Sequence, residues 1–188
     1  MTTRPASAGR EIPTGREEVA AAILEAATDL FAERGPAATS IRDIGARSKV
    51  NHGLVFRHFG TKEQLVGAVL DHLGTDLTGL LQSGAPADVV EKAFDRQMRV
   101  MARTVLDGYP AEQLQKRFPN VAGLLDEVRP RHDTEIGAQM AVANALALQL
   151  GWRLFAPILR SSTGLDELSD AELRRAVDAE VDRIVEPH

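Results

Sequence analysis

The sequence contains no cysteine and few aromatic residues, namely one Trp, one Tyr and six Phe among 188 positions. A chain without thiols forms no disulfide, no thiolate zinc site and no cysteine nucleophile. Aromatic residues favour strands, whereas the Ala and Leu that are abundant in this chain are strong helix formers. The composition therefore predicts a helical protein.

Long apolar runs and targeting signals are also missing. No stretch approaches the roughly 20 apolar residues that a membrane-spanning helix needs, and residues 1–16 lack the apolar centre of a signal peptide. The Pro, Gly, Ser and Thr content of residues 1–15 predicts a disordered arm. With 44% hydrophobic and 26% charged residues the rest of the chain can form a soluble core, so we expect a cytoplasmic protein that meets no membrane.

Recognisable groups of catalytic or metal-binding side chains are absent from the sequence as well. It shows no Ser/His/Asp grouping, no phosphate-binding loop and no cluster with metal-ligand spacing. The five His are scattered, and His52 and His58 are six residues apart, which places them on different faces of a helix. We therefore expect no enzyme activity, no metal site and no cofactor.

Charge is the first informative feature that is present. The chain has a net charge of −5, but residues 40–62 hold five Lys or Arg against one acid, Asp43, which gives this segment a charge of +4. Residues 1–74 are balanced at nine basic and nine acidic side chains, so the negative charge belongs to residues 75–188. A basic segment on an acidic chain indicates a polyanionic partner at that segment.

The basic segment has the pattern of a helix-turn-helix that follows a longer helix. Residues 16–34 repeat apolar side chains at the spacing of one helix face, and Gly35-Pro36 ends that helix. Ser40 and Asp43 are spaced as a capping box at the start of the next helix, and after a polar break Asn51 caps a helix over 51–59. The side chains that we expect to bury in the two short helices are Ile41, Ile44, Gly45, Val50, Val55, Phe56 and Phe59.

Helical patterns continue to the end of the chain. Apolar residues at helical spacing predict helices over 61–81, 88–106, 132–160 and 170–185. Pro110, Pro119 and Pro130 limit residues 107–130 to one or two short helices. No strand pattern occurs, so the predicted fold class is all-α.

Three motifs resemble those of the tetracycline-repressor (TetR) family of bacterial transcription regulators. They are SIRDIG, VNHGLVFRHF and TKEQL, and they occur in the family's order and spacing within about residues 16–70. The resemblance implies a three-helix DNA-binding domain over 16–62 and a helical domain over 63–188 that binds an effector and dimerises. It also implies a repressor that a small molecule releases from DNA. The alternatives are a DNA-binding dimer without an effector, an activator, or an enzyme, for which no catalytic group is readable.

Three positions depart from the family pattern. Lys49 stands where the family usually has Gly, so either a Lys adopts a left-handed backbone, at a cost on the order of 1 kcal/mol, or the turn has another shape. Phe56 replaces a Tyr whose hydroxyl could bond a phosphate. Leu54 replaces a small polar residue and could touch a thymine methyl group.

The contacts with double-stranded DNA divide into phosphate and base contacts. Ser40, at a helix N-terminus, suits a phosphate because free N–H groups and the helix dipole favour an anion, and Lys62 at the start of the following helix should do the same. The basic side chains between the buried positions are better placed for the major groove, where Arg binds guanine through two hydrogen bonds. The predicted DNA-contacting residues are Ser40, Arg42, Lys49, Asn51, His52, Leu54, Arg57, His58 and Lys62.

Soft side chains in the second half are candidates for an effector pocket. Met and aromatic residues at helical spacing are usually core, but they also suit an apolar ligand, and amides among apolar neighbours need a partner. Since the second half is acidic without a concentrated basic patch, we expect a small, mainly apolar effector that is neutral or cationic. The residues that we expect to face one interior are Phe94, Gln97, Met98, Met101, Phe118, Met140 and Asn144.

The helix over 132–160 is apolar on more than one side. We expect Met140, Ala143, Ala147, Leu150 and Leu154 to cover the rest of the chain, which leaves a second apolar side exposed. Such a stripe is a liability in a monomer, so we predict a homodimer with a four-helix interface across a two-fold axis and a near-palindromic operator. The predicted interface residues are Gly137, Ala141, Leu148, Trp152, Phe155, Leu173, Val177, Val181 and Ile184.

Overall fold

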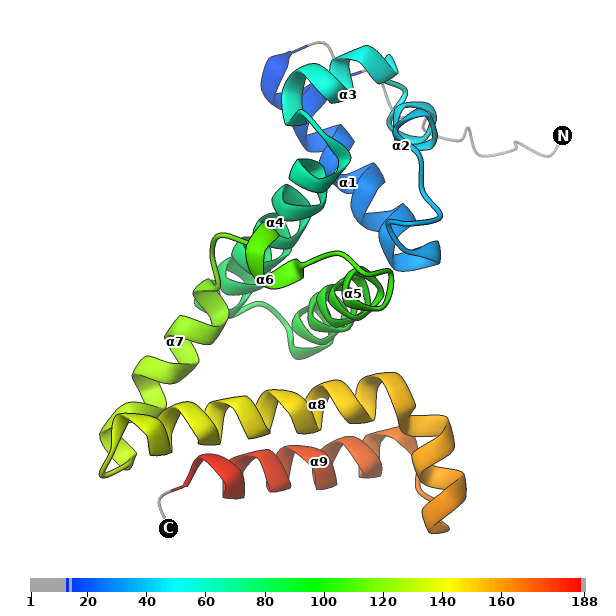
Figure 1. Cartoon of the computed structure of the whole chain (residues 1–188). Helices are drawn as coiled ribbons and strands as arrows, with labels where there is room; N and C mark the ends of the chain where they lie inside the picture. The colour runs from blue at the N-terminus through cyan, green and yellow to red at the C-terminus, as the bar shows by residue number, and fades with distance from the viewer. Residues whose placement is uncertain (1–12, 14, 187–188) are drawn as a thin grey trace, which may run out of the picture. The chain divides into compact units, whose positions relative to one another are not determined.

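The computed structural model describes residue 13 and residues 15–186, and the regular structure in this range is entirely helical (Figure 1). The prediction of an all-α fold is confirmed. The arm predicted over residues 1–15 lies outside the described residues apart from Pro13 and Gly15. In chain order the elements are α1 (Arg16–Arg34), α2 (Ile41–Ser48), α3 (His52–Phe59), α4 (Lys62–Gln82), α5 (Ala87–Leu106), α6 (Ala111–Leu114), α7 (Pro119–Val128), the 3-10 helix η1 (Arg129–Arg131), α8 (Glu135–Thr163) and α9 (Asp170–Val185).

The chain divides into two compact units, which we call the head and the body. The head comprises the described residues up to 69 together with residues 103–115, and the body comprises residues 70–102 and those from 116 onwards. This division differs from the boundary expected between residues 62 and 63, because the first turns of α4 carry fully buried apolar side chains that belong to the head.

The three N-terminal helices form the head around a small apolar core. Ile23 and Phe31 of α1, Ile44 of α2 and Val55 of α3 are completely buried. α1 ends at Gly35, whose φ of +81° is a left-handed conformation that favours glycine, and its N–H donates to Phe31 O over 3.0 Å. The predicted end of this helix is therefore confirmed.

Residues 103–115 join the head through two close approaches. Asp107 Oδ2 accepts a hydrogen bond of 2.7 Å from the backbone N–H of Ala37, which lies between α1 and α2. On α4, a Cβ at Gly67 would lie only 2.5 Å from the carbonyl oxygen of Leu114, so glycine allows α6 to approach α4 closely. The loop after α5 is thus held against the start of α2.

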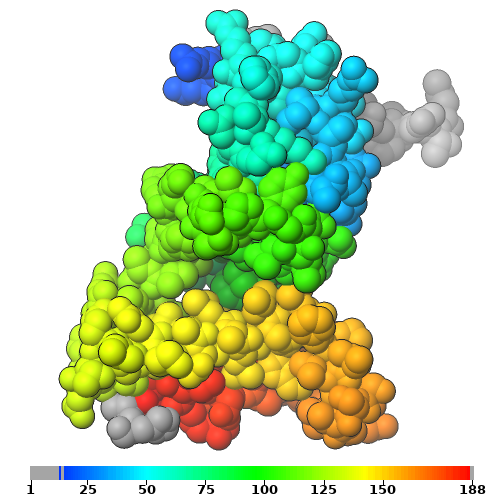
Figure 2. All heavy atoms as spheres, viewed as in Figure 1, coloured from blue at the N-terminus to red at the C-terminus, as the bar shows by residue number. Residues whose placement is uncertain are grey.

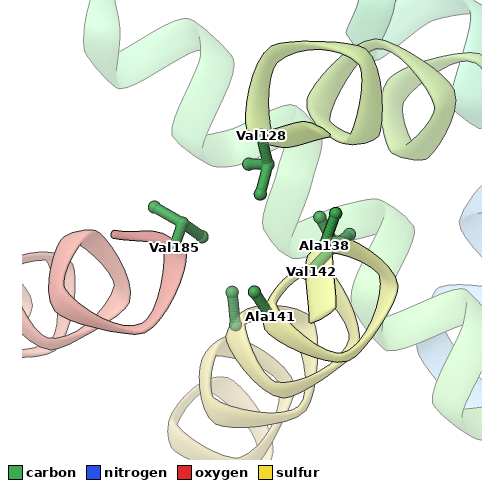
Figure 3. Packing of buried hydrophobic residues seen from close by; sticks show 6 residues of the cluster. Val128, Ala138, Ala141, Val142 and Val185 are labelled. Atoms are coloured by element: carbon green, nitrogen blue, oxygen red, sulfur yellow. The ribbon is translucent and has the colours of Figure 1, made fainter. Parts of the chain in front are cut away.

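The best-defined core of the body lies where α7, α8 and α9 meet (Figure 3). Val128 at the end of α7 and Val185 at the end of α9 enclose small residues of α8, including Ala138 and Ala141. Val181 and Ile184 pack against the same cluster. Three of the residues predicted for an intermolecular interface, Ala141, Val181 and Ile184, therefore take part in packing within the chain, because α9 folds back along α8 (Figure 1).

The long helix α8 extends from Glu135 to Thr163, slightly beyond its predicted end. It changes direction in its last turns (Figure 1), where Pro157 interrupts the backbone hydrogen bonds. By length and composition only, α8 is long and apolar enough to cross a membrane, and no other helix of the described residues is. The sequence reading missed this, because isolated uncharged polar residues such as Gln139, Asn144 and Gln149 interrupt the apolar run.

Candidate nucleic-acid interface

The N-terminus of α2 carries a capping box. Ser40 and Asp43 form the predicted capping box: Ser40 Oγ accepts the Asp43 N–H over 3.1 Å, and the Ser40 N–H donates to Asp43 Oδ2 over 2.9 Å. These hydrogen bonds from Ser40, with Arg34 Nη2 at 3.0 Å, hold the pKa of Asp43 below its ordinary value of 3.8. The N–H groups of Ile41 and Arg42, which precede Asp43 in α2, have no acceptor inside the helix, and the phosphate contact expected at Ser40 stays a prediction.

The turn between α2 and α3 has a left-handed backbone at Lys49, which is the first of the two possibilities that the sequence offered at this position. Lys49 has φ +58° and ψ +29° and is the one non-glycine residue with positive φ in the described part of the chain. Its N–H donates to Ala46 O and the N–H of Val50 donates to Gly45 O, which together form a Schellman motif. A Cβ on Gly45 would lie 2.8 Å from the Val50 carbonyl oxygen, so glycine is needed where the turn closes on α2.

Helix α3, the second helix of the helix-turn-helix, is held at its N-terminus by a cap and along one side by a buried residue, and its other side is exposed. Asn51 Oδ1 accepts the Gly53 N–H over 2.8 Å at its N-terminus, as predicted, and Val55 is completely buried. His52 and Arg57 are exposed, as a reading surface requires, and Leu54 and His58 are half-buried.

Phe56 was expected in the core and lies on the surface, with 63% of its area exposed. Successive helical residues differ by about 100°, so a helix that buries Val55 turns Phe56 outwards next to Arg57. A large exposed aromatic residue beside an exposed Arg is a candidate for a sugar or thymine-methyl contact. The sequence did hold a signal for this surface position. The family has a Tyr here whose hydroxyl could bond a phosphate, and a side chain that contacts a phosphate cannot be buried.

Arg47 contributes less free charge than its sequence position indicates. Its guanidinium binds the Glu33 carboxylate with two hydrogen bonds of 3.0 Å, between α2 and α1. The side-chain hydrogen bonds that Arg47 donates to Glu33 lower the pKa of Glu33 and raise the pKa of Arg47. The local charge of +4 therefore overstates the field, because Glu33 lies outside residues 40–62 but beside Arg47. In the part of the chain that the structure describes, Arg42 and Arg57 form no ion pair.

Arg16, the first residue of α1, adds to this basic surface. With Val19 it lines a cleft of about 320 Å³ whose other wall is Leu54, Arg57 and His58 of α3. Two exposed arginines from helices far apart in sequence thus border one cleft beside the recognition helix. The sequence predicted a helix that begins at Arg16, which is confirmed, but it did not indicate that Arg16 lies beside α3.

Lys62 is the first residue of α4 and is partly engaged inside the head. Its Nζ lies 3.5 Å from the carbonyl oxygen of Ala37 and 5.8 Å from the centre of the Tyr109 ring. Thr61 and Gln64 cap α4 through reciprocal hydrogen bonds of 2.8 and 3.3 Å. Lys62 therefore brings positive charge to the helix end next to α2, where a phosphate bound by Ser40 would also lie.

The residues expected in an effector pocket do not converge on one interior. Phe94 lines a cavity of the body, and Gln97 is buried, but Phe118, Met140 and Asn144 are exposed. Met98 and Met101 are half-buried and line neither of the two cavities of the body. Helical spacing alone could not tell which side of α7 and α8 faces inwards. The body instead contains two cavities, of about 280 and 260 Å³, that share Gln149, Arg153 and Asp178.

The exposed face of α8 also differs from the expected one. Ile136, Met140, Phe155 and Ile158 are 54–72% exposed, and Ala143 and Ala147, expected to cover the body, are exposed as well. Figure 2 shows α8 uncovered along its length on the face turned to the viewer. The remaining predicted interface residues Gly137, Leu148, Trp152, Leu173 and Val177 are half-buried, and three of them, Trp152, Leu173 and Val177, line the smaller cavity. The described residues hold no group of three or more His, Cys, Asp or Glu that could bind a metal ion.

Comparison with known proteins adds independent findings. The family model described as "Bacterial regulatory proteins, tetR family" matches residues 23–69. The chain is 75% identical, over 188 residues and the full length of both chains, to an HTH-type transcriptional repressor of Mycobacterium tuberculosis and to an HTH-type transcriptional regulator of Mycobacterium bovis. Among solved structures it is similar in fold to a Mesorhizobium loti protein assigned to the TetR family, with a TM-score of 0.61 at 18% identity over 92% of this chain and 97% of that chain.

Proposed function

Because the chain belongs to the tetR family of bacterial regulatory proteins, we propose that it binds a near-palindromic operator as a homodimer and that a small molecule weakens this binding. Family membership makes the protein a DNA-binding transcriptional regulator rather than an enzyme, as its motifs predicted. A regulator that acts on DNA is a soluble, intracellular protein. The apolar length of α8 is weak evidence against this, since Arg153 and Arg160 of the same helix form ion pairs within the body.

The exposed face of α3 is the observation that carries the proposed mode of DNA binding. The Asn51 cap and buried Val55 fix the helix, so His52, Phe56 and Arg57 stand on one open surface. A recognition helix of this kind enters the major groove and reads bases near its N-terminus. Ser40 and Lys62, at the N-termini of α2 and α4, would bind phosphates on either side and set the register of the helix.

The exposed face of α8 supports the proposed homodimer. Large apolar side chains that are more than half exposed, such as Ile136 and Ile158, favour association. A two-fold interface buries the same patch of both subunits. The revised interface therefore centres on Ile136, Met140, Phe155 and Ile158 rather than on the side of α8 that holds Ala141.

The cavities of the body support an effector. A ligand changes DNA affinity only if it binds better to the form whose two recognition helices are wrongly spaced for successive major grooves. The coupling is reciprocal, so DNA must weaken ligand binding by the same factor. A dimer that binds DNA with no effector is the alternative.

The test is selection of bound duplexes from a random library, followed by binding measurements over a range of salt concentrations. We expect a site with dyad symmetry and half-sites about one helical turn apart or somewhat more, with affinity that falls steeply as salt rises. A selected site without dyad symmetry would exclude binding as a symmetric dimer. Equal affinity for all duplexes would exclude base reading by α3.

A further inference from the structure

The larger cavity of the body has apolar walls and lies wholly within that unit. Its volume is about 280 Å³, and its walls come from α4, α5, α7, α8 and α9. This is close to the lower end of small-molecule sites, so it suits a compact ligand with an apolar body. The apolar wall is formed chiefly by Leu77, Val90, Phe94, Val121, Leu124 and Leu146.

Two oxygen atoms of residues that line this cavity are buried without a hydrogen bond. They are Asn120 Oδ1 on α7 and Glu91 Oε2 on α5. Glu91 Oε2 lies 3.0 Å from Arg174 Nη1, which is an ion-pair distance, but the contact lacks the geometry of a hydrogen bond. Both atoms are acceptors, and a buried acceptor without a donor is unfavourable. A ligand with donor hydrogens is therefore favoured here over one with acceptors only.

Acidic side chains outnumber basic ones by one in and next to the cavity lining. Arg153 pairs with both Glu91 and Asp95, and Arg174 pairs with Glu91. Asp178 of α9 lines the cavity and forms no ion pair in the described part of the chain. The cavity lining thus holds two carboxylates, Glu91 and Asp178, and one guanidinium, that of Arg153. Asp95 and Arg174, which pair with this group from outside the lining, add one charge of each sign, so a ligand with one positive charge would balance the set.

The same region already holds a cation against an aromatic ring. The Arg153 guanidinium carbon lies 4.5 Å from the centre of the Phe94 ring, and its side chain is only 20% exposed. Cation–π contact and carboxylate pairing together stabilise a partly desolvated positive charge. The cavity wall therefore tolerates the kind of charge that the ligand would bring.

We propose that this cavity binds a small organic amine. The apolar body of the amine lies against Phe94 and its aliphatic neighbours, while the protonated amino group donates to Asn120 Oδ1 and neutralises Asp178. The inference rests on the proposed function, because it gives the chemical class of the effector. A ligand with a carboxylate is disfavoured by the excess of acidic side chains.

The experiment compares three probes with one apolar body and different head groups, namely phenylbutylamine, phenylbutanol and phenylbutyrate. Binding to the full-length protein without DNA is measured by titration calorimetry and by the shift in melting temperature. We expect the amine to bind about tenfold more tightly than the alcohol, and the carboxylate to bind most weakly of the three. Asp178→Asn should reduce the preference for the amine about fivefold, and Asn120→Leu should weaken binding of both the amine and the alcohol.

Asp182→Asn is the matched control, since it removes an exposed acid of α9 that does not line the cavity. It should leave the order of the three probes unchanged. The inference is overturned if none of the probes binds, if the carboxylate binds as tightly as the amine, or if Asp178→Asn and Asp182→Asn behave alike. Because Asp178 is exposed, its variant keeps the test valid if Asn120→Leu fails to fold.

DNA binding is then measured separately with and without the amine. An amine that binds the protein but leaves operator affinity unchanged would contradict the proposed release mechanism and leave the chemistry of the cavity intact. Release of DNA by some other compound, with no binding of the amine, would contradict the proposed chemistry of the cavity and leave the release mechanism intact.

Discussion

At the scale of single residues, the side chains that α3 exposes are set by which of its residues is buried. Burial of Val55 turns Phe56 and Arg57 outwards, so two neighbouring side chains of different chemistry lie ready for one groove. Arg57 can donate two hydrogen bonds to guanine, whereas Phe56 can contribute only an apolar contact. We therefore predict that Arg57 is the residue of this pair that discriminates between bases.

Arg57→Ala should weaken binding to the selected operator by about 1–3 kcal/mol and relax the preference at one base pair. Fluorescence anisotropy with the operator and a set of singly substituted duplexes measures both effects. Arg99→Ala, which removes an exposed Arg from the body, is the charge-matched control and should leave the base preference unchanged. An equal loss on all duplexes would make Arg57 a phosphate contact instead.

Lys49 carries the strain of the turn. A left-handed backbone costs a non-glycine residue roughly 1–2 kcal/mol, and a β-branched residue more. Lys49→Asn should therefore keep or slightly raise the free energy of unfolding, and Lys49→Val should lower it by about 1–2 kcal/mol. Urea denaturation of the three proteins gives the comparison, and a stable Lys49→Val protein would mean that the turn takes another conformation in solution.

At the scale of elements, a charged hydrogen bond at the N-terminus of α2 stabilises the folded head. The capping hydrogen bonds from Ser40 lower the pKa of Asp43. A lowered pKa in the folded state means that the stabilisation is fully present well above the unfolded value of 3.8 and is lost as the pH falls through the folded value. The cap of α2 is therefore sensitive to acid and insensitive to changes around neutrality.

Asp43→Asn should lower the melting temperature at neutral pH, and the difference from the unmodified protein should shrink as the pH falls below about 3.8. Thermal unfolding followed by circular dichroism between about pH 7 and pH 3 measures it. A difference that stays constant down to the lowest pH would show that Asp43 acts through packing rather than through its charge.

The loop after α5 is a second control point at this scale, because Asp107 binds the backbone just before α2. Asp107→Ala removes the acceptor of the Ala37 N–H and should destabilise the head by about 1 kcal/mol. Hydrogen exchange should show faster exchange at Ala37, and operator affinity should fall as the start of α2 loosens. Asp133→Ala, at an exposed position outside any helix, serves as the control. Unchanged exchange at Ala37 would remove Asp107 from this role.

At the scale of the whole molecule, the proposed binding to a near-palindromic operator requires two recognition helices at a fixed separation, and we propose that the exposed face of α8 forms the interface that sets it. Ile158→Glu places a charge where an apolar side chain is 67% exposed in the single chain. If this residue is buried between subunits, an unpaired charge there costs several kcal/mol. The variant should be monomeric by analytical ultracentrifugation and should lose operator binding. Thr163→Glu, at an exposed position on a different side of the same helix, should remain dimeric, and a dimeric Ile158→Glu protein would move the interface elsewhere.

The sequence by itself determined what depends on short-range rules. The capping box of Ser40 and Asp43 and the end of α1 at Gly35 each concern residues within a few positions of each other, and the helical composition and the motifs are properties of the sequence alone. Backbone propensity and local hydrogen bonds fix such features, so the all-α fold and the DNA-binding family followed from them.

Only the tertiary structure decided which side of each helix faces inwards. The surface position of Phe56, the ion pair of Arg47 with Glu33, the burial of Ala141 and the gathering of Asn120, Asp178 and Phe94 around one cavity each depend on another element. Helical periodicity gives a stripe but not its absolute direction when a helix is apolar on several sides, as α8 is. That direction is set by close packing between segments far apart in the sequence, because small residues let two helices approach and larger ones keep them apart.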